Sequence, residues 1–178
     1  MIRSLFVSLQ ELNKGARRPA GVPETRFRKI GVLGAGFMGA GIAYVTARAG
    51  IPVVLLDRDI PSAEKGKQHS ADLMDGLIKK GRATEEEKQK LLDLLTPTDD
   101  YKLLEGCDLI VEAVFEDSEI KKGVTEKAEA VLARSAIFAS NTSTIPITSL
   151  AKNSARPKNF IGIHFFSPVD KMMLVEII

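Results

Sequence analysis

Short apolar runs rich in β-branched residues alternate with segments of helical spacing from Arg28 to the end of the chain, and this alternation constrains the fold most. The runs predict strands at residues 29–33, 52–57, 109–114, 136–140 and 160–164, and the spacing predicts helices at 38–49 and 120–133. Near-continuous apolar strands are typical of a sheet that helices cover on both faces. The sequence therefore predicts an α/β fold with a doubly wound, mainly parallel sheet.

Two intervals depart from this rhythm. Residues 60–95 are too many for one crossover helix, and Gly81 divides them, so we expect a helical hairpin inserted after the second strand. The connection 167–172 is too short for a parallel crossover. Residues 174–178 are therefore predicted to form an antiparallel edge strand beside the strand that ends at His164, which lets Glu176 approach this histidine.

Charge and cysteine content exclude several classes of protein. A net charge of +2 over 178 residues indicates neither a nucleic-acid partner nor a membrane-surface partner. The single cysteine, Cys107, excludes an internal disulfide and is typical of a reducing compartment. Two histidines and one cysteine are too few ligands for a structural zinc site, so we expect no bound metal. No apolar run approaches the ~20 residues that a membrane span needs.

Residues 1–27 differ in character from the rest of the chain. Five apolar residues fall on one face of a short amphipathic helix: Ile2, Leu5, Phe6, Leu9 and Leu12. The Gly-, Pro- and Arg-rich stretch 15–23 is typical of a linker. We interpret residues 1–27 as a helix and linker that follow an upstream region. The alternative is a mitochondrial transit peptide, because residues 1–21 contain arginines and serines with a single acid.

A glycine motif stands between the first strand and the helix that follows it. Gly34, Gly36 and Gly39 have the GxGxxG spacing, and they permit a tight turn, close approach of backbone to a pyrophosphate, and tight packing of helix on strand. Asp57 lies 18 residues after Gly39, at the end of the second strand, where it can accept hydrogen bonds from ribose hydroxyls. The pattern predicts a Rossmann-type site that prefers NAD to NADP, although the neighbouring Arg58 weakens this preference.

Other polar groups follow the predicted strands. Residues 112–117 (EAVFED) follow the third strand, 140–143 (SNTS) follow the fourth, and His164 closes the fifth. Ligands bind outside the carboxyl ends of parallel strands, so these groups are expected to gather at one edge. Each also has an ordinary structural alternative: helix-dipole partners at Glu116 and Asp117, a solvated face for Lys121, turn residues at 140–144, and a core histidine at His164.

With these motifs in hand, the chain resembles the L-3-hydroxyacyl-CoA dehydrogenase family over Arg28 to Ile178. The stretches that carry the resemblance are VLGAGFMGAGIA, LIVEAVFED, IFASNTSTIPI, RPKNFIGIHFFSPVDKM and LVEII, in family order. HFFSPVDKM is most similar to the multifunctional β-oxidation proteins, because the single-function enzymes usually have Asn at the position of Ser167. In the multifunctional proteins an enoyl-CoA hydratase region lies upstream, joined by a helix that MIRSLFVSLQEL resembles.

The resemblance implies a catalytic pair, His164 and Glu176, with Ser143 on the substrate side. It implies NAD as the cofactor, with contacts at Gly34, Gly36, Phe37, Met38, Gly39, Asp57, Val114, Phe115, Glu116, Lys121, Asn141, Ser143 and Ser167. It also implies an acyl-CoA thioester substrate and a helical C-terminal domain beyond Ile178, which carries a further active-site asparagine and most of the dimer interface. A full-length protein of this kind is expected to be oligomeric, and a thiolase subunit is one partner that the resemblance suggests. The expected location is a bacterial-type cytoplasm or, alternatively, the mitochondrial matrix.

The expected reaction is NAD-dependent oxidation of L-3-hydroxyacyl-CoA to 3-ketoacyl-CoA in fatty-acid β-oxidation. An imidazole titrates near neutral pH and suits the proton transfer, and a carboxylate on its other nitrogen fixes the tautomer. One alternative is a non-catalytic NAD-binding or structural module of the same fold, against which His164 and Glu176 argue. Another is a 3-hydroxyacid dehydrogenase with a catalytic lysine beyond Ile178, against which the SNTS and HFF stretches argue. Residues 1–178 alone are expected to show little or no turnover.

Overall fold

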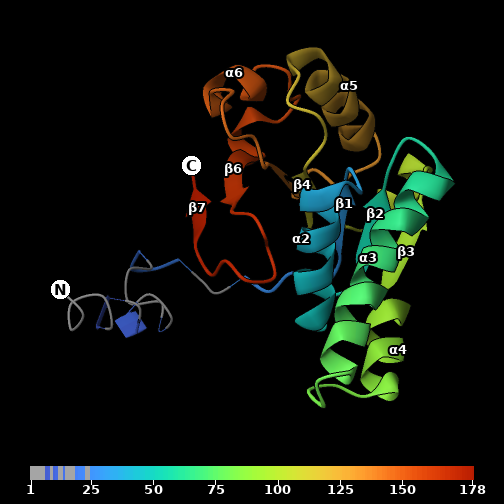
Figure 1. Cartoon of the computed structure of the whole chain (residues 1–178). Helices are drawn as coiled ribbons and strands as arrows, with labels where there is room; N and C mark the ends of the chain where they lie inside the picture. The colour runs from blue at the N-terminus through green and yellow to red at the C-terminus, as the bar shows by residue number, and fades with distance from the viewer. Residues whose placement is uncertain (1–6, 9, 12–13, 15–18, 23–24) are drawn as a thin grey trace.

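The computed structural model describes residues 7–8, 10–11, 14, 19–22 and 25–178 (Figure 1). The described residues form a seven-stranded sheet in the order β3-β2-β1-β4-β5-β6-β7. The strands are β1 (Ile30–Leu33), β2 (Val53–Leu56), β3 (Leu95–Thr98), β4 (Leu109–Glu112), β5 (Ile137–Ser140), β6 (Phe160–Phe165) and β7 (Val175–Ile177). The helices are α2 (Phe37–Arg48), α3 (Ile60–Ile78), α4 (Glu85–Asp93), α5 (Ser118–Glu129) and α6 (Ile147–Ala151), with short 3₁₀ turns η1 (Tyr101–Leu104) and η2 (Pro157–Asn159).

Strand direction follows the prediction. Strands β1 to β6 pair in parallel, so their carboxyl ends share one edge of the sheet, which we call the carboxyl edge. The strand order reverses at β1, with β2 on one side and β4 on the other, which is where such sheets bind ligands. Strand β7 lies beside β6 (Figure 1). It pairs antiparallel with β6, which places Glu176 directly opposite His164. The predicted antiparallel edge strand is confirmed.

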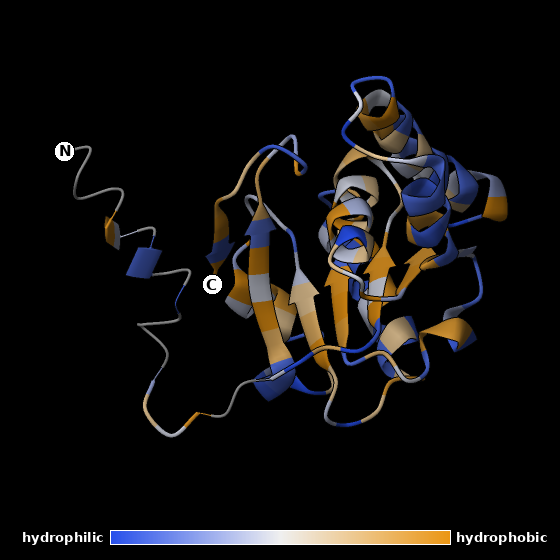
Figure 2. Cartoon of the chain, turned by 90° about the horizontal axis from the view of Figure 1, so that it is seen from below, coloured by the Kyte–Doolittle hydropathy of each residue, from blue (hydrophilic) through white to orange (hydrophobic). Residues whose placement is uncertain are grey.

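Two apolar layers enclose the sheet, as a doubly wound fold requires. Alternate residues of each strand point to opposite faces, so Val53 and Leu55 pack in one layer with α2, α3 and α4, whereas Val54 and Leu56 pack in the other. That second layer includes residues of α5 and α6. Coloured by hydropathy, the central strands appear mainly hydrophobic (Figure 2). Because both faces of the sheet are packed, the residues at its carboxyl edge have a well-defined support.

The helical hairpin predicted after the second strand consists of α3 and α4, which lie side by side (Figure 1). Asp59 caps α3 by accepting from the Ser62 N–H, and Thr84 and Glu87 form a reciprocal capping box at α4. Gly81 lies between the helices with φ +65°, a left-handed conformation that glycine adopts at low cost. The prediction of a division at Gly81 is confirmed.

Strand β3 and helix α6 were not predicted from the sequence. Pro97 lies within β3, and proline argues against a central strand because it has no N–H to donate. The strand lies at the outer end of the sheet, where a missing donor is tolerated. Helix α6 has five residues, too few for the helical period to show.

The amphipathic face predicted for the N-terminal helix, Ile2 to Leu12, lies outside the described residues. Val7, Ser8, Gln10 and Glu11 have helical geometry. Over the part of the chain that the structure describes, every helix is too short or too polar to cross a membrane.

Candidate active site

The glycine loop between β1 and α2 is built from close backbone contacts. Gly34 has φ +90°, and a Cβ there would lie 2.7 Å from the carbonyl oxygen of Ala113. A Cβ on Gly39 would lie 1.7 Å from the carbonyl oxygen of Gly34, so no side chain fits at either position. Gly36 differs, because a Cβ there meets nothing within 4 Å. The protein leaves open the one position of the three at which a ligand would approach the backbone.

The amino end of α2 is prepared for an anion. Its N-cap residue, Gly36, makes no side-chain capping bond, and the first turn contains no acidic residue. The first N–H groups of a helix lack partners within the helix and carry a partial positive charge. Phe37, which is 60% exposed, and Met38 flank this end. These features fit the pyrophosphate of a dinucleotide.

Asp57 immediately follows β2 and holds the glycine loop from one side. Its carboxylate accepts the backbone N–H of Ala35 at 2.6 Å and that of Arg58 at 2.7 Å. A carboxylate has about four acceptor positions, so two remain for ribose hydroxyls. The Arg58 side chain, 80% exposed, forms an ion pair with Asp59 at 3.2 Å. Arg58 weakened the predicted preference for NAD because its guanidinium could bind the 2′-phosphate of NADP. The ion pair with Asp59 competes with such a phosphate for this guanidinium.

His164, Glu176 and Ser143 come together although they belong to three different segments. The carboxylate of Glu176 lies 2.9 Å from Nδ1 of His164, and the Ser143 hydroxyl lies 3.3 Å from Nε2. An ionised carboxylate only accepts, so Nδ1 of the neutral ring carries the proton and the Nε2 lone pair faces Ser143. The His164 side chain is 20% exposed, so it is neither a core histidine nor a fully solvated one. This arrangement can take up a proton at Nε2.

Glu116 holds the loop that carries Ser143, which we define as residues 141–144 and call the Ser143 loop. Four donors of this loop reach Oε1 of Glu116: Thr142 Oγ1 (2.5 Å), Ser143 N (2.9 Å), Thr144 N (2.9 Å) and Thr144 Oγ1 (3.0 Å). Burial alone would raise the pKa of Glu116. The hydrogen bonds from the loop and the nearby Lys121 charge outweigh burial and lower this pKa to about 2. Glu116 is thus a carboxylate at any physiological pH.

Lys121 is buried, which contradicts the alternative that it lies on a solvated helix face. Its side chain is 1% exposed, and its ammonium lies 2.7 Å from Glu112 Oε1, 3.3 Å from Glu116 Oε2 and 3.5 Å from the Val114 carbonyl oxygen. A buried ammonium requires such partners, because an unpaired charge in the interior costs several kcal/mol or more. Lys121 therefore lies behind Glu116, and its direct contact with the cofactor stays a prediction.

The remaining predicted residues also lie at the carboxyl edge. Asn141 follows β5, and its Oδ1 accepts the Phe165 N–H at 2.8 Å, which leaves the amide NH₂ as its donor end. Val114 and the 79% exposed Phe115 follow β4, and the exposed Ser167 follows β6. The structure thus gathers all the predicted site residues at one edge, as their positions after the strands indicated.

Some ordinary structural roles did apply, and some residues were missed. Asp117 caps α5 by accepting the N–H groups of Glu119 and Ile120. The sequence suggested only an ordinary turn role for Thr142 and Thr144, and it drew attention to Glu112 only as part of the EAVFED stretch. The signal for Glu112 was a carboxylate inside an otherwise apolar strand, where a charge is costly unless it is paired.

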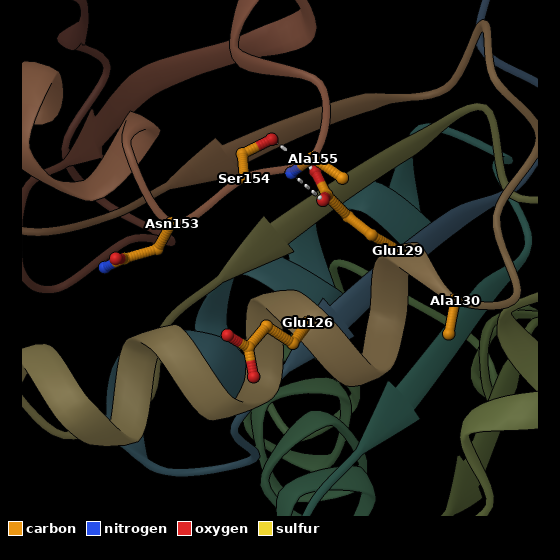
Figure 3. A pocket seen from close by; sticks show the side chains of 6 residues that line it. All are labelled: Glu126, Glu129, Ala130, Asn153, Ser154 and Ala155. Carbon is orange, nitrogen blue, oxygen red and sulfur yellow. Dashed lines mark hydrogen bonds between the residues drawn. The ribbon is translucent and has the colours of Figure 1, made fainter.

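A pocket of about 410 Å³ lies elsewhere, between the end of α5 and the turn after α6 (Figure 3). Glu126, Glu129, Ala130, Asn153, Ser154 and Ala155 line it. This end of α5 is roughly 18 Å from Asp117, which caps the start of the helix at the carboxyl edge. The pocket therefore takes no part in the site.

Comparison with known proteins identifies a family for most of the chain. Residues 29–178 match the family model described as 3-hydroxyacyl-CoA dehydrogenase, NAD binding domain. Among solved structures, the chain is similar to (S)-3-hydroxybutyryl-CoA dehydrogenase PaaH1 from Ralstonia eutropha, with 38% identity and a TM-score of 0.82. The match covers 85% of this chain and 54% of that one.

Two further solved structures match this chain over a smaller share of their own length. The 3-hydroxybutyryl-CoA dehydrogenase from Escherichia coli is 32% identical with a TM-score of 0.82, over 86% of this chain and 32% of that one. The dehydrogenase part of multifunctional enzyme 1 from C. elegans is 31% identical with a TM-score of 0.75, over 86% and 35% respectively. The chain thus spans about half or less of the length of these three structures.

Proposed function

Because the chain belongs to the family of 3-hydroxyacyl-CoA dehydrogenase NAD-binding domains, we propose that it supplies the cofactor site and the acid–base group for oxidation of L-3-hydroxyacyl-CoA to 3-ketoacyl-CoA. The observation that carries the proposal is the array of Ser143, His164 and Glu176, with 3.3 Å and 2.9 Å between successive polar atoms. A non-catalytic NAD-binding module would not need a histidine at the carboxyl edge whose two ring nitrogens both have polar partners.

The cofactor has a defined place in this proposal. The open Gly36 and the uncapped amino end of α2 receive the pyrophosphate, and Asp57 receives the ribose hydroxyls. NAD, when bound, supplies the hydride acceptor. Phe37, Met38, Val114, Phe115 and Ser167, with Glu116, Lys121 and Asn141, are the remaining proposed contacts at the carboxyl edge.

Nε2 of His164 would accept the proton of the substrate's 3-hydroxyl, while the hydrogen on carbon 3 of the substrate would leave as a hydride, with its two electrons, to the bound nicotinamide. The substrate thus loses one proton and one hydride. Glu176 keeps the proton on Nδ1 and stabilises the imidazolium that forms. Ser143, whose hydroxyl already faces Nε2, hydrogen-bonds the substrate oxygen. In the reverse direction His164 returns the proton to the 3-keto oxygen.

The wider setting is part of the same proposal. The reaction belongs to fatty-acid β-oxidation in a bacterial-type cytoplasm, within a multifunctional enzyme in which residues 1–27 link residues 28–178 to an upstream hydratase region. A helical domain after Ile178 completes the substrate site and most of the dimer interface. The similarity to the dehydrogenase part of C. elegans multifunctional enzyme 1 supports the multifunctional part of this setting.

The proposal is tested first by a titration of NADH with the 178-residue chain. The chain has no tryptophan, so NADH fluorescence is recorded without tryptophan emission. We expect saturable binding at micromolar or weaker affinity. 3-Ketoacyl-CoA-dependent NADH oxidation is then measured with a polypeptide that continues past Ile178. Absence of binding to the chain together with absence of turnover by the longer polypeptide would refute the proposed function.

A further inference from the structure

Glu112 is the most deeply buried carboxylate near the site, and nothing in the proposed reaction uses it. It is the last residue of β4, and its side chain is 1% exposed. Oε1 accepts from Lys121 Nζ at 2.7 Å and from Val114 N at 2.8 Å, and Oε2 accepts the Ser140 hydroxyl at 2.7 Å. Apolar residues at such a place often give equal or greater stability than a buried ion pair. Stability alone therefore does not account for Glu112, and its bonds to Ser140 and Lys121 indicate a further role.

One route from Glu112 to the Ser143 loop is short. Ser140 donates its hydroxyl hydrogen to Glu112, and its oxygen then accepts the backbone N–H of Thr142 at 3.3 Å. Because the hydroxyl hydrogen is committed to the carboxylate, the oxygen lone pairs are oriented toward Thr142. Glu112 thus fixes the first turn of the loop that carries Ser143.

A second route leads through the buried ammonium. Lys121 lies between the two carboxylates, 2.7 Å from Glu112 Oε1 and 3.3 Å from Glu116 Oε2. Glu116 in turn accepts from the loop, at Thr142, Ser143 and Thr144. Without Glu112 the ammonium has one carboxylate partner among the described residues, and it is expected to move toward Glu116. Both routes therefore end on the Ser143 loop, the first at Thr142 and the second at Thr142, Ser143 and Thr144.

We propose that Glu112 is a positioning residue, which fixes the Ser143 loop through Ser140 and Lys121 and so sets the distance between Ser143 Oγ and His164 Nε2. Its value for catalysis rests on the proposed function, whereas the geometric effect does not. Catalytic groups depend on placement, and a misplacement of about 1 Å can lower a rate about 100-fold. Glu112 touches neither His164 nor Ser143 and acts only through the loop.

The test uses the 178-residue chain without cofactor or substrate. In Glu112→Gln, we measure hydrogen exchange of the Ser143 amide and the ¹⁵N resonances of the His164 ring. We expect Ser143 exchange to become about tenfold faster and the Nε2 resonance of His164 to shift, because the hydroxyl that faces it moves. The only other histidine, His69 on α3, serves as an internal reference and should not change.

Two further variants keep the test decisive if Glu112→Gln does not fold, since it leaves a buried ammonium with one carboxylate less. Ser140→Ala removes only the short route and leaves the buried charges paired. Glu112→Gln combined with Lys121→Met removes both buried charges at once, so no ammonium is orphaned. Each variant should speed hydrogen exchange of the Ser143 amide and shift the His164 Nε2 resonance in the same direction as Glu112→Gln.

Glu129 provides a matched control within the chain (Figure 3). Its side chain is 6% exposed and accepts from Ser154 Oγ at 2.5 Å and Ala155 N at 2.7 Å, so it too anchors a loop, at the far end of α5. Glu129→Gln should speed exchange at Ala155 and leave the Ser143 amide and the His164 ring unchanged.

The proposal is overturned if the folded variants at Glu112, Ser140 and Lys121 leave the Ser143 amide and the His164 ring as in the unmodified chain. It is also overturned if Glu129→Gln changes them equally, because the effect would then be general destabilisation. Failure of the unmodified chain to bind NADH would count against the proposed function while leaving these loop measurements intact. The positioning role of Glu112 and the proposed function can therefore each be refuted without the other.

Discussion

Replacing Glu116 by Gln should destabilise the protein in a pH-dependent way, because it removes the charge that gathers the Ser143 loop. The pKa of Glu116 falls from its ordinary value of 4.5 to about 2 in the folded protein. At ~1.4 kcal/mol per pKa unit, this difference corresponds to roughly 3 kcal/mol. The side chain is 36% exposed, and screening by solvent reduces the expected effect to about 1–2 kcal/mol.

The sign of the pH dependence follows from the lowered pKa of Glu116. The carboxylate is favoured in the folded state, so its contribution to the free energy of unfolding is complete above pH 4.5. The contribution decreases as the pH falls below 4.5 and is lost near pH 2, where the folded protein also binds the proton. The difference in stability between the unmodified chain and Glu116→Gln should shrink over this range.

The assay is urea unfolding followed by circular dichroism at several pH values between 7 and 3. Glu126→Gln is the matched control, because Glu126 is an exposed carboxylate on α5 with no side-chain hydrogen bond or ion pair to the described residues. The control should change the free energy of unfolding by less than about 0.5 kcal/mol. A Glu116→Gln variant as stable as the unmodified chain at pH 7, or less stable by an amount independent of pH, would refute the reasoning.

Four other outcomes are expected. NAD should bind more tightly than NADP, and Asp57→Ala should reduce the difference between the two affinities, as measured by titration with each cofactor. Equal affinities of the unmodified chain for NAD and NADP would contradict the role of Asp57. In a longer, active polypeptide, His164→Ala should lower kcat about 10²–10⁴-fold with little change in NADH affinity, and Glu176→Gln should lower it less. Residues 1–178 alone should bind NADH yet turn over little or no 3-hydroxyacyl-CoA, since positioning by both halves of a site can supply about 7–11 kcal/mol; turnover equal to that of the longer polypeptide would show the site to be complete. Burial raises the pKa of Cys107 to about 11, so iodoacetamide at pH 8 should alkylate the native thiol far more slowly than the thiol in urea, and equal rates would show that this thiol is accessible.

The sequence predicted the elements whose signals are local. Strand–helix alternation, the glycine spacing and the length of the connection 167–172 each depend on neighbouring residues, and they gave the parallel sheet, the loop before α2 and the antiparallel β7. The meeting of His164 with Glu176 followed from that connection, because an antiparallel return places them on facing strands. The gathering of polar groups at the carboxyl edge followed from strand direction alone.

What the sequence did not predict depends on partners in other elements of the fold. Helical spacing of α5 does not tell whether Lys121 faces solvent, because the answer lies in Glu112 on a strand nine residues earlier. The bonds from Thr142 and Thr144 to Glu116 join residues 26 and 28 positions apart. Strand β3 was missed because Pro97 is tolerated only at the edge of a sheet, and the order of strands cannot be read from one strand.

The central claim is that His164 transfers the proton in an NAD-dependent reaction of 3-hydroxyacyl-CoA. The most direct measurement is 3-ketoacyl-CoA-dependent NADH oxidation by a polypeptide that continues past Ile178, compared between the unmodified protein and His164→Ala with NADH affinity recorded in parallel. The account predicts that the variant binds NADH normally and loses about 10²–10⁴-fold in kcat. Equal turnover by the two proteins would contradict it and return His164 to a structural role.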